Sequence, residues 1–270
     1  MYLCGDIQQK VNSIREIIDA LERFAPLPLQ DDYDNSGLQV GTTETEVSGV
    51  LLCLDVTRQV VDEAMRNGCN MIVSHHPLLF RPLKKLTDDP IGSIVMDAVR
   101  AGITIYASHT NLDNASKGVN MRIAQVLGLQ EVRTLDEQPD GNGAGVIGSF
   151  AQPMTELELL ALVKGKFGVT CIRHNAELGR KISRMAVCGG AGAFLTDKAV
   201  AAGADAFMTG EIGYHRFFGY DGVIKLIEAG HFESEQYTVD LLGDVLHQSF
   251  PQLKVIKTEC KTSPINYYIG

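Results

Sequence analysis

The stretch IVSHHPLLF, residues 72–80, places two neighbouring histidines at the end of an apolar run. Successive side chains of a β-strand point to opposite faces, so adjacent histidines do not make a convenient pair inside regular strand structure. Pro77 follows them directly and fixes the next step of the chain. We therefore predict that a buried strand ends here and that His75 and His76 leave it together to hold a ligand. A solvated pair of loop histidines is the alternative.

The bulk composition excludes several classes of protein. The 270 residues are 45% hydrophobic and 21% charged, as is typical of globular proteins. A formal net charge of −9 argues against general nucleic-acid or anionic-membrane binding, because no basic excess can neutralise phosphates. We find no signal-peptide pattern and no apolar run long enough to span a membrane. The six cysteines form no C-x-x-C pair, so we expect reduced thiols in the cytoplasm rather than a cysteine zinc site.

Apolar runs that alternate with amphipathic segments predict an α/β fold. The chain begins with helical spacing over residues 8–28, followed by a turn-rich stretch at 30–41. In the first half we expect strands at 47–56, 69–74 and 103–108, and helices at 57–68, 89–102 and 119–129. Because these strands are continuously apolar, we expect a parallel sheet that is covered by helices on both faces.

The polar, glycine-rich stretch 136–145 is the best candidate for an internal boundary. After it we expect a strand and a helix within 146–168, strands at 181–190, 204–211 and 219–231, and helices at 196–203 and 234–250. A late strand at 253–258 has few neighbours in its own half and is expected to return to the first. We therefore predict a first α/β domain over residues 1–129, completed by 236–270, and a second α/β domain over 130–235.

The two halves align as a degenerate duplication. Residues 68–76, GCNMIVSHH, correspond to 203–211, GADAFMTGE, which places Glu211 at the position of His76. The segments ITIYASHTNLD and IKLIEAGHFESE place His109 opposite His231 and Asp113 opposite Glu235. Any two strand–helix units can be aligned loosely, but the equal spacing from histidine to carboxylate favours a shared geometry.

The side chains that follow the predicted strands are of the kinds that bind divalent cations. They are His75, His76, His109, Asp113, Glu211, His231 and Glu235. Open α/β sheets place their sites at the carboxyl ends of strands. Imidazole and carboxylate without thiolate suit zinc, iron, manganese, cobalt or nickel, and a water between two such ions becomes a nucleophile near neutral pH. His109 has three possible roles: ligand, donor to substrate, or positioning of a ligand, which we favour.

Weaker features keep two interpretations each. The turn CGGAGAF at 188–194 has amides for a phosphate or carboxylate, or is only a tight strand-to-helix turn. It lacks the glycine spacing of a dinucleotide-binding fold, which we exclude. Asp34 and Asn35 reach a site mouth or form Asx turns, and His215 lines the pocket or has no role. A basic loop either binds an anionic substrate or is only solvated. Its residues are Arg81, Lys84 and Lys85.

Five motifs together resemble one known family. The motifs are YDNSGLQVG, SHHPLLF, SHTNLD, TGE and GHFESE. Their order and spacing are similar to those of the Nif-three-like proteins, also called GTP cyclohydrolase 1 type 2 homologues. The resemblance runs from the first helix to about residue 250. Tyr33 stands where the family often has Trp, and the additional domain that longer relatives insert between the halves is absent.

The resemblance implies two interwoven α/β domains that face each other across a cleft with two divalent metal ions, and a toroidal homohexamer. Transferred position by position, the metal ligands are His75, His76, Asp113, His231 and Glu235. The resemblance also implies a hydrolase that acts on a small nucleotide-like molecule, with opening of the imidazole ring of GTP as one reaction. We expect His109 or Glu211 to transfer protons. The alternative is a non-enzymatic metal-binding or regulatory scaffold; an open coordination position on each metal favours the enzyme.

Overall fold

The first sheet contains the strand that precedes the paired histidines. In the computed structural model, which describes residues 12–268, this sheet has the order β1 (Gly37–Val40), β4 (Thr104–Ala107), β3 (Met71–Ser74), β2 (Val50–Cys53) and β11 (Val255–Lys257). The four strands from β4 to β11 are parallel, and β1 is antiparallel to β4. The late strand thus pairs with β2 in this sheet, as expected. Residues 1–11 lie outside the described residues, and with them the helical positions expected at 8–11, Cys4 and the stretch in which a signal-peptide pattern was sought.

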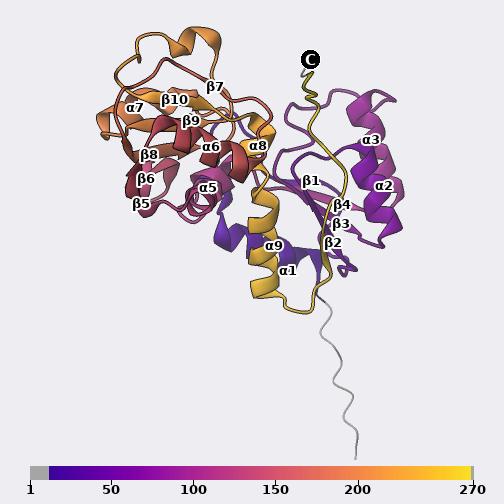
Figure 1. Cartoon of the computed structure of the whole chain (residues 1–270). Coiled ribbons are helices and arrows are strands. Elements are labelled where there is room, and N and C mark those ends of the chain that lie inside the picture. Colours follow the sequence, from indigo (N-terminus) through magenta and orange to yellow (C-terminus); the bar gives the residue numbers. More distant parts are fainter. Residues whose placement is uncertain (1–11, 269–270) are drawn as a thin grey trace, which may run out of the picture.

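Helices cover both faces of the first sheet, as predicted. The outer face carries α2 (Arg58–Arg66) and α3 (Pro90–Arg100), and the other carries α1 (Ile14–Phe24) and α9 (Thr238–Ser249) (Figure 1). Side-chain caps fix where the helices begin. Ser13 and Glu16 form a capping box at α1, and Thr57 caps α2, so backbone N–H groups that have no partner within the helix are satisfied.

The second sheet is mixed rather than parallel throughout. Its order is β5 (Gln130–Glu137), β6 (Gly143–Met154), β8 (Ile182–Cys188), β9 (Ala206–Thr209), β10 (Lys225–Glu228) and β7 (Arg173–His174). Only β8, β9 and β10 run parallel. The parallel arrangement that was expected for the first sheet is therefore found here only at the centre. The glycine-rich stretch forms the β5–β6 hairpin, closed by a 2.7 Å hydrogen bond from the Gln138 amide to the Asn142 carbonyl.

The remaining helices lie around this sheet and in the connection between the two. They are α4 (Thr110–Asn114), α5 (Val119–Leu127), α6 (Glu156–Phe167), α7 (Thr196–Ala201) and α8 (His231–Glu235), with short 3₁₀ turns at Leu27–Leu29, Ala193–Leu195 and Tyr214–Phe217. The single helix expected at 234–250 is instead α8 and α9, separated at Gln236. The Gln236 and Tyr237 side chains donate to carbonyl oxygens at the end of α6, 2.8 and 2.5 Å away, and hold the break in place.

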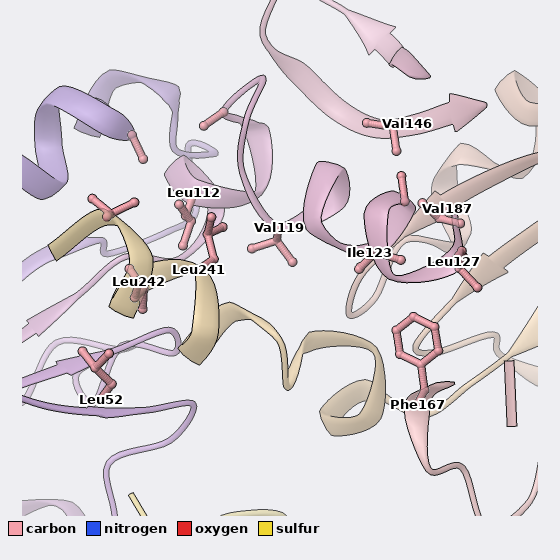
Figure 2. Packing of buried hydrophobic residues seen from close by; sticks show 14 of the residues in the cluster. Leu52, Leu112, Val119, Ile123, Leu127, Val146, Phe167, Val187, Leu241 and Leu242 are labelled. Atoms are coloured by element: carbon pink, nitrogen blue, oxygen red, sulfur yellow. The ribbon is translucent and has the colours of Figure 1, made fainter. Parts of the chain in front are cut away.

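One hydrophobic core connects the two sheets. It runs from Leu52 of the first sheet through α9 and α5 to Val187 of the second (Figure 2). Because packed cores resist displacement, this shared core fixes the two halves relative to one another and lets side chains from both meet at one site. The predicted α/β fold with two interwoven halves is confirmed; the domain boundaries stay a prediction. Within residues 12–268, no helix has the length and apolar character needed to cross a bilayer.

Candidate metal centre

Four histidine rings from both halves of the chain meet at the carboxyl ends of parallel strands. His75 and His76 follow β3, and His109 follows β4. His231 follows β10 and begins α8. The centre of the His76 ring lies 4.9 Å from that of His75, 5.4 Å from that of His109 and 5.3 Å from that of His231. The two short helices α4 and α8 occupy equivalent places in the two halves, in agreement with the internal alignment.

Each of these rings is oriented by a hydrogen bond at Nδ1. Nδ1 of His75 lies 2.8 Å from the carbonyl oxygen of Ser108. Because a carbonyl oxygen can only accept a hydrogen bond, Nδ1 is the donor. The other three rings face carboxylates at Nδ1: Asp55 beside His76 at 2.8 Å, Asp34 beside His109 at 2.7 Å and Glu211 beside His231 at 2.8 Å. A neutral ring that donates through Nδ1 presents the lone pair of Nε2, as metal-binding histidines do.

Two carboxylates face these Nε2 atoms. Glu235 is only 3% exposed, and its Oε2 lies 3.0 Å from Nε2 of His76 and 3.1 Å from Nε2 of His231. Oδ1 of Asp113 lies 3.6 Å from Nε2 of His75, too far for a hydrogen bond. These last two atoms are buried and have no hydrogen-bond partner. Since buried polar atoms are rarely left unpaired, they indicate a ligand that both would contact.

The buried carboxylates raise the affinity of the cluster for positive charge. Burial lowers the pKa of His76, but its hydrogen bonds to Asp55 and Glu235 outweigh that effect and raise the pKa to about 10. The same balance raises the pKa of His231 to about 9. Burial favours the neutral form of Glu235, yet hydrogen bonds from the histidines hold its pKa well below the usual range. Protons and a divalent cation would therefore compete for this cluster.

The ligand atoms are close enough to bind a cation. They form two groups, and in each group the ligand atoms lie within 4.8 Å of one another. The first group comprises His75, His76 and His109. The second group comprises His76, His231 and Glu235, so the two groups share one residue. Nitrogen and oxygen donors in this mixture fit first-row divalent ions. The cluster could therefore hold a metal ion, and His109, for which the role of ligand was one of three expected from the sequence, lies within reach of it.

The glycine turn after β8 packs against Glu235. Gly190 has a φ of +59°, and a Cβ built on it would lie 2.2 Å from Oε1 of Glu235. The amides of the turn have internal partners: Gly189 donates to Asn120 at 2.9 Å, Gly190 to Ser234 at 3.1 Å and Gly192 to Thr209 at 2.8 Å. These amides are therefore committed to the fold, which favours the tight turn over the phosphate site. The adjacent Gly189 and Gly190, where an added Cβ would lie 3.3 and 2.2 Å from the Glu235 side chain, let this turn approach the carboxylate closely.

Two cavities border the cluster. The larger, about 400 Å³, has an apolar wall made of Pro77, Phe80, Phe232, Pro264 and Ile265, and a polar wall made of Asp55, His76, His109, Glu211 and His231. The smaller, about 180 Å³, is lined by His109, Asp113, His231 and Glu235 and by the aromatic rings of Tyr33 and Phe194. Among the described residues, no lysine or arginine lines either cavity.

The other residues singled out from the sequence have different fates. Asp34 is buried beneath His109, where burial raises its pKa but hydrogen bonds from His109 and Thr110 outweigh this and lower it. Asp34 therefore supports the ring instead of lying at a site mouth. Glu211 lines the larger cavity and accepts from His231. His215 contacts Tyr214 and does not line either cavity. The basic loop is exposed beside Phe80.

Two residues of the site, Asp55 and Thr262, were not expected from the sequence. Asp55 follows β2 and orients His76. The sequence could have indicated Asp55, because a carboxylate just after a buried strand lies at the same sheet edge as the histidines. Thr262 donates to the other oxygen of Asp55 at 2.9 Å. It had no signal, since only the fold brings residue 262 back to the end of β2.

Comparisons of the sequence with known proteins identify the family. The sequence model of the Duf34/NIF3 (NGG1p interacting factor 3) family matches residues 12–264. A GTP cyclohydrolase 1 type 2 homolog from Lactococcus lactis subsp. lactis is 37% identical over 252 residues, which cover 90% of this chain and 95% of that protein. One from Clostridium acetobutylicum is 32% identical over 247 residues, covering 90% and 92%.

Solved structures give the same result for the fold. The crystal structure of a hypothetical protein from Staphylococcus aureus matches with a TM-score of 0.89 at 28% identity, and the match covers 96% of this chain and 100% of that one. A Bacillus cereus protein related to NIF3 matches with a TM-score of 0.86 at 24% identity, covering 96% and 100%. The chain therefore belongs to the Duf34/NIF3 family.

Proposed function

We propose that the protein is a hydrolase that uses two divalent metal ions held by His75, His76, Asp113, His231 and Glu235. The observation that carries the proposal is the common orientation of four rings, each fixed at Nδ1, with Nε2 of His75, His76 and His231 facing Asp113 or Glu235. When bound, such ions supply Lewis-acid activation of water and of the substrate. Zinc, iron, manganese, cobalt and nickel all suit these donors.

Proton transfer falls to His109 or Glu211. Both line the larger cavity, where a substrate would contact them. Nδ1 of His109 is committed to Asp34 at 2.7 Å, so Nε2 is the atom that can give or take a proton. Oε1 of Glu211 accepts from His231 at 2.8 Å, which leaves its Oε2 for this role.

The cavity favours recognition of a ring. Phe80 and Phe232 provide flat apolar surface in a space of about 400 Å³, within the usual range for small-molecule sites. Among residues 12–268 no lysine or arginine lines the cavity, and the exposed basic loop lies outside it, beyond Phe80. We therefore propose a small nucleotide-like heterocycle as substrate, with opening of the GTP imidazole ring as the first reaction to test.

The first experiment is metal content per chain, measured by elemental analysis. We expect close to two metals in wild type and a sharp fall in His75→Ala and Glu235→Ala. His247→Ala is the matched control, because His247 is exposed on α9 outside the cluster. Wild-type protein that holds no metal even after reconstitution with iron, zinc or manganese would contradict the proposal.

Activity is tested on the reconstituted protein. Release of formate from GTP, or a change in the guanine absorption, reports opening of the imidazole ring. Phe80→Ala should raise KM, because it removes one aromatic wall of the cavity. The scaffold would be favoured if the protein held two metals with every coordination position filled by its own side chains and did not hydrolyse GTP.

A further inference from the structure

The C-terminal segment returns to the cluster after β11. Thr258 and the Glu259 amide both donate to Glu63 on α2, the latter at 2.8 Å, and anchor the start of this segment. Figure 1 shows the segment rising from β11 alongside the first sheet. Thr262 is 8% exposed and is the one buried residue of the segment 258–268. Its neighbours in the segment are partly buried or exposed, so the burial of this threonine indicates a specific contact.

That contact connects the segment to a proposed metal ligand. Oγ1 of Thr262 donates to Oδ2 of Asp55 at 2.9 Å, while Oδ1 of Asp55 accepts from Nδ1 of His76 at 2.8 Å. Each carboxylate oxygen therefore has one partner. Without the hydroxyl, rotation of the carboxylate would no longer be restrained on the side away from His76. Nε2 of His76 lies 3.0 Å from Glu235, at the centre of the cluster.

We propose that Thr262 is a positioning residue, which fixes Asp55 and through it the orientation of His76 toward the metal. The inference rests on the proposed metal site. The residues that follow, Ser263, Pro264 and Ile265, line the larger cavity. The same segment therefore orients a ligand and forms part of the wall that a substrate would contact.

The expected effect is on metal affinity. Hydrogen-bond partners behind metal ligands typically contribute about 10- to 100-fold to affinity. Thr262 acts one step further from the metal than Asp55 does, so we expect Thr262→Val to weaken binding by roughly the lower figure, about 10-fold. Thr262→Ser keeps the hydroxyl and should restore affinity close to that of wild type.

Cobalt(II) is the probe, since its visible absorption reports both binding and coordination geometry. The full-length chain is titrated as wild type, Thr262→Val, Thr262→Ser and Thr258→Val. Thr258→Val is the matched control, because it removes another hydroxyl that anchors the same segment but contacts Glu63 instead of Asp55. We expect weaker binding and an altered spectrum for Thr262→Val alone.

Three outcomes would overturn the inference. Equal cobalt affinity in Thr262→Val and wild type, with binding lost in His75→Ala, removes the role of Thr262 and leaves the metal site intact. Equal loss in Thr258→Val and Thr262→Val assigns the effect to anchoring of the segment. Wild-type protein that binds no cobalt refutes the proposed metal site and this inference with it.

Discussion

Gly190→Ala tests whether the glycine turn places Glu235. The new Cβ would lie 2.2 Å from Oε1 of Glu235, whereas ordinary contacts begin at 3.4 Å, so the carboxylate must move by roughly 1 Å. Glu235 is buried and is close to His76 and His231, so this movement changes the distances on which the cluster depends. We expect a loss of metal affinity of roughly 10-fold or more.

The substitution also has a backbone cost that must be separated from the movement of the carboxylate. An alanine at a φ of +59° costs about 1–2 kcal/mol in the left-handed region. Gly168→Ala is the matched control, because Gly168 has a φ of +64° and no atom within 4 Å of the added Cβ. Both variants should lower Tm by a few degrees, about 2–4 °C for each kcal/mol.

The two variants should differ in metal binding alone. Thermal unfolding gives the stability change, and elemental analysis with cobalt titration gives the metal affinity. Gly168→Ala is expected to bind metal as wild type does, and Gly190→Ala is not. If Gly190→Ala retained the affinity of the control, the close approach of the turn to Glu235 would have no role in the site.

Further predictions concern stability, pH and assembly. Lys225 is 1% exposed and pairs with Glu156 at 3.0 Å, so Glu156→Gln should cost about 3 kcal/mol in urea unfolding, whereas Glu177→Gln on the exposed neighbouring loop should not. Burial raises the pKa of Glu156, but hydrogen bonds from Lys225 and two backbone amides outweigh this effect and lower the pKa from 4.5. The ion pair therefore stabilises the fold above that pH. The difference in unfolding free energy between wild type and Glu156→Gln should shrink as the pH falls below it. Asp34→Asn should destabilise the ring of His109 and cost about 1–3 kcal/mol, measured by the same unfolding, and a negligible loss would refute its role as the support of that ring. Light scattering should give six times the 29.4 kDa chain mass, and a monomer would contradict the expected hexamer.

Local sequence patterns determined most of the elements. The helix expected within 146–168 begins at the capping box of Thr155 and Glu158, whose hydrogen bonds join residues only three positions apart. The apolar runs became strands whose ends hold His75, His76, His109 and His231, since parallel strands end at one edge of a sheet. The residue types and their spacing thus selected the four histidines whose rings meet, but not Asp55.

Tertiary structure decided the contacts between distant parts of the chain. In the second sheet β6 lies antiparallel to β8, although α6 and β7 separate these two strands in the chain. Gly190 approaches Glu235 because β8 and β10 lie in one sheet with only β9 between them, so that the residues following both strands meet at the same edge. Thr262 meets Asp55 across 207 positions of sequence. No local pattern encodes such a contact, because its energy depends on where the whole fold brings the two groups.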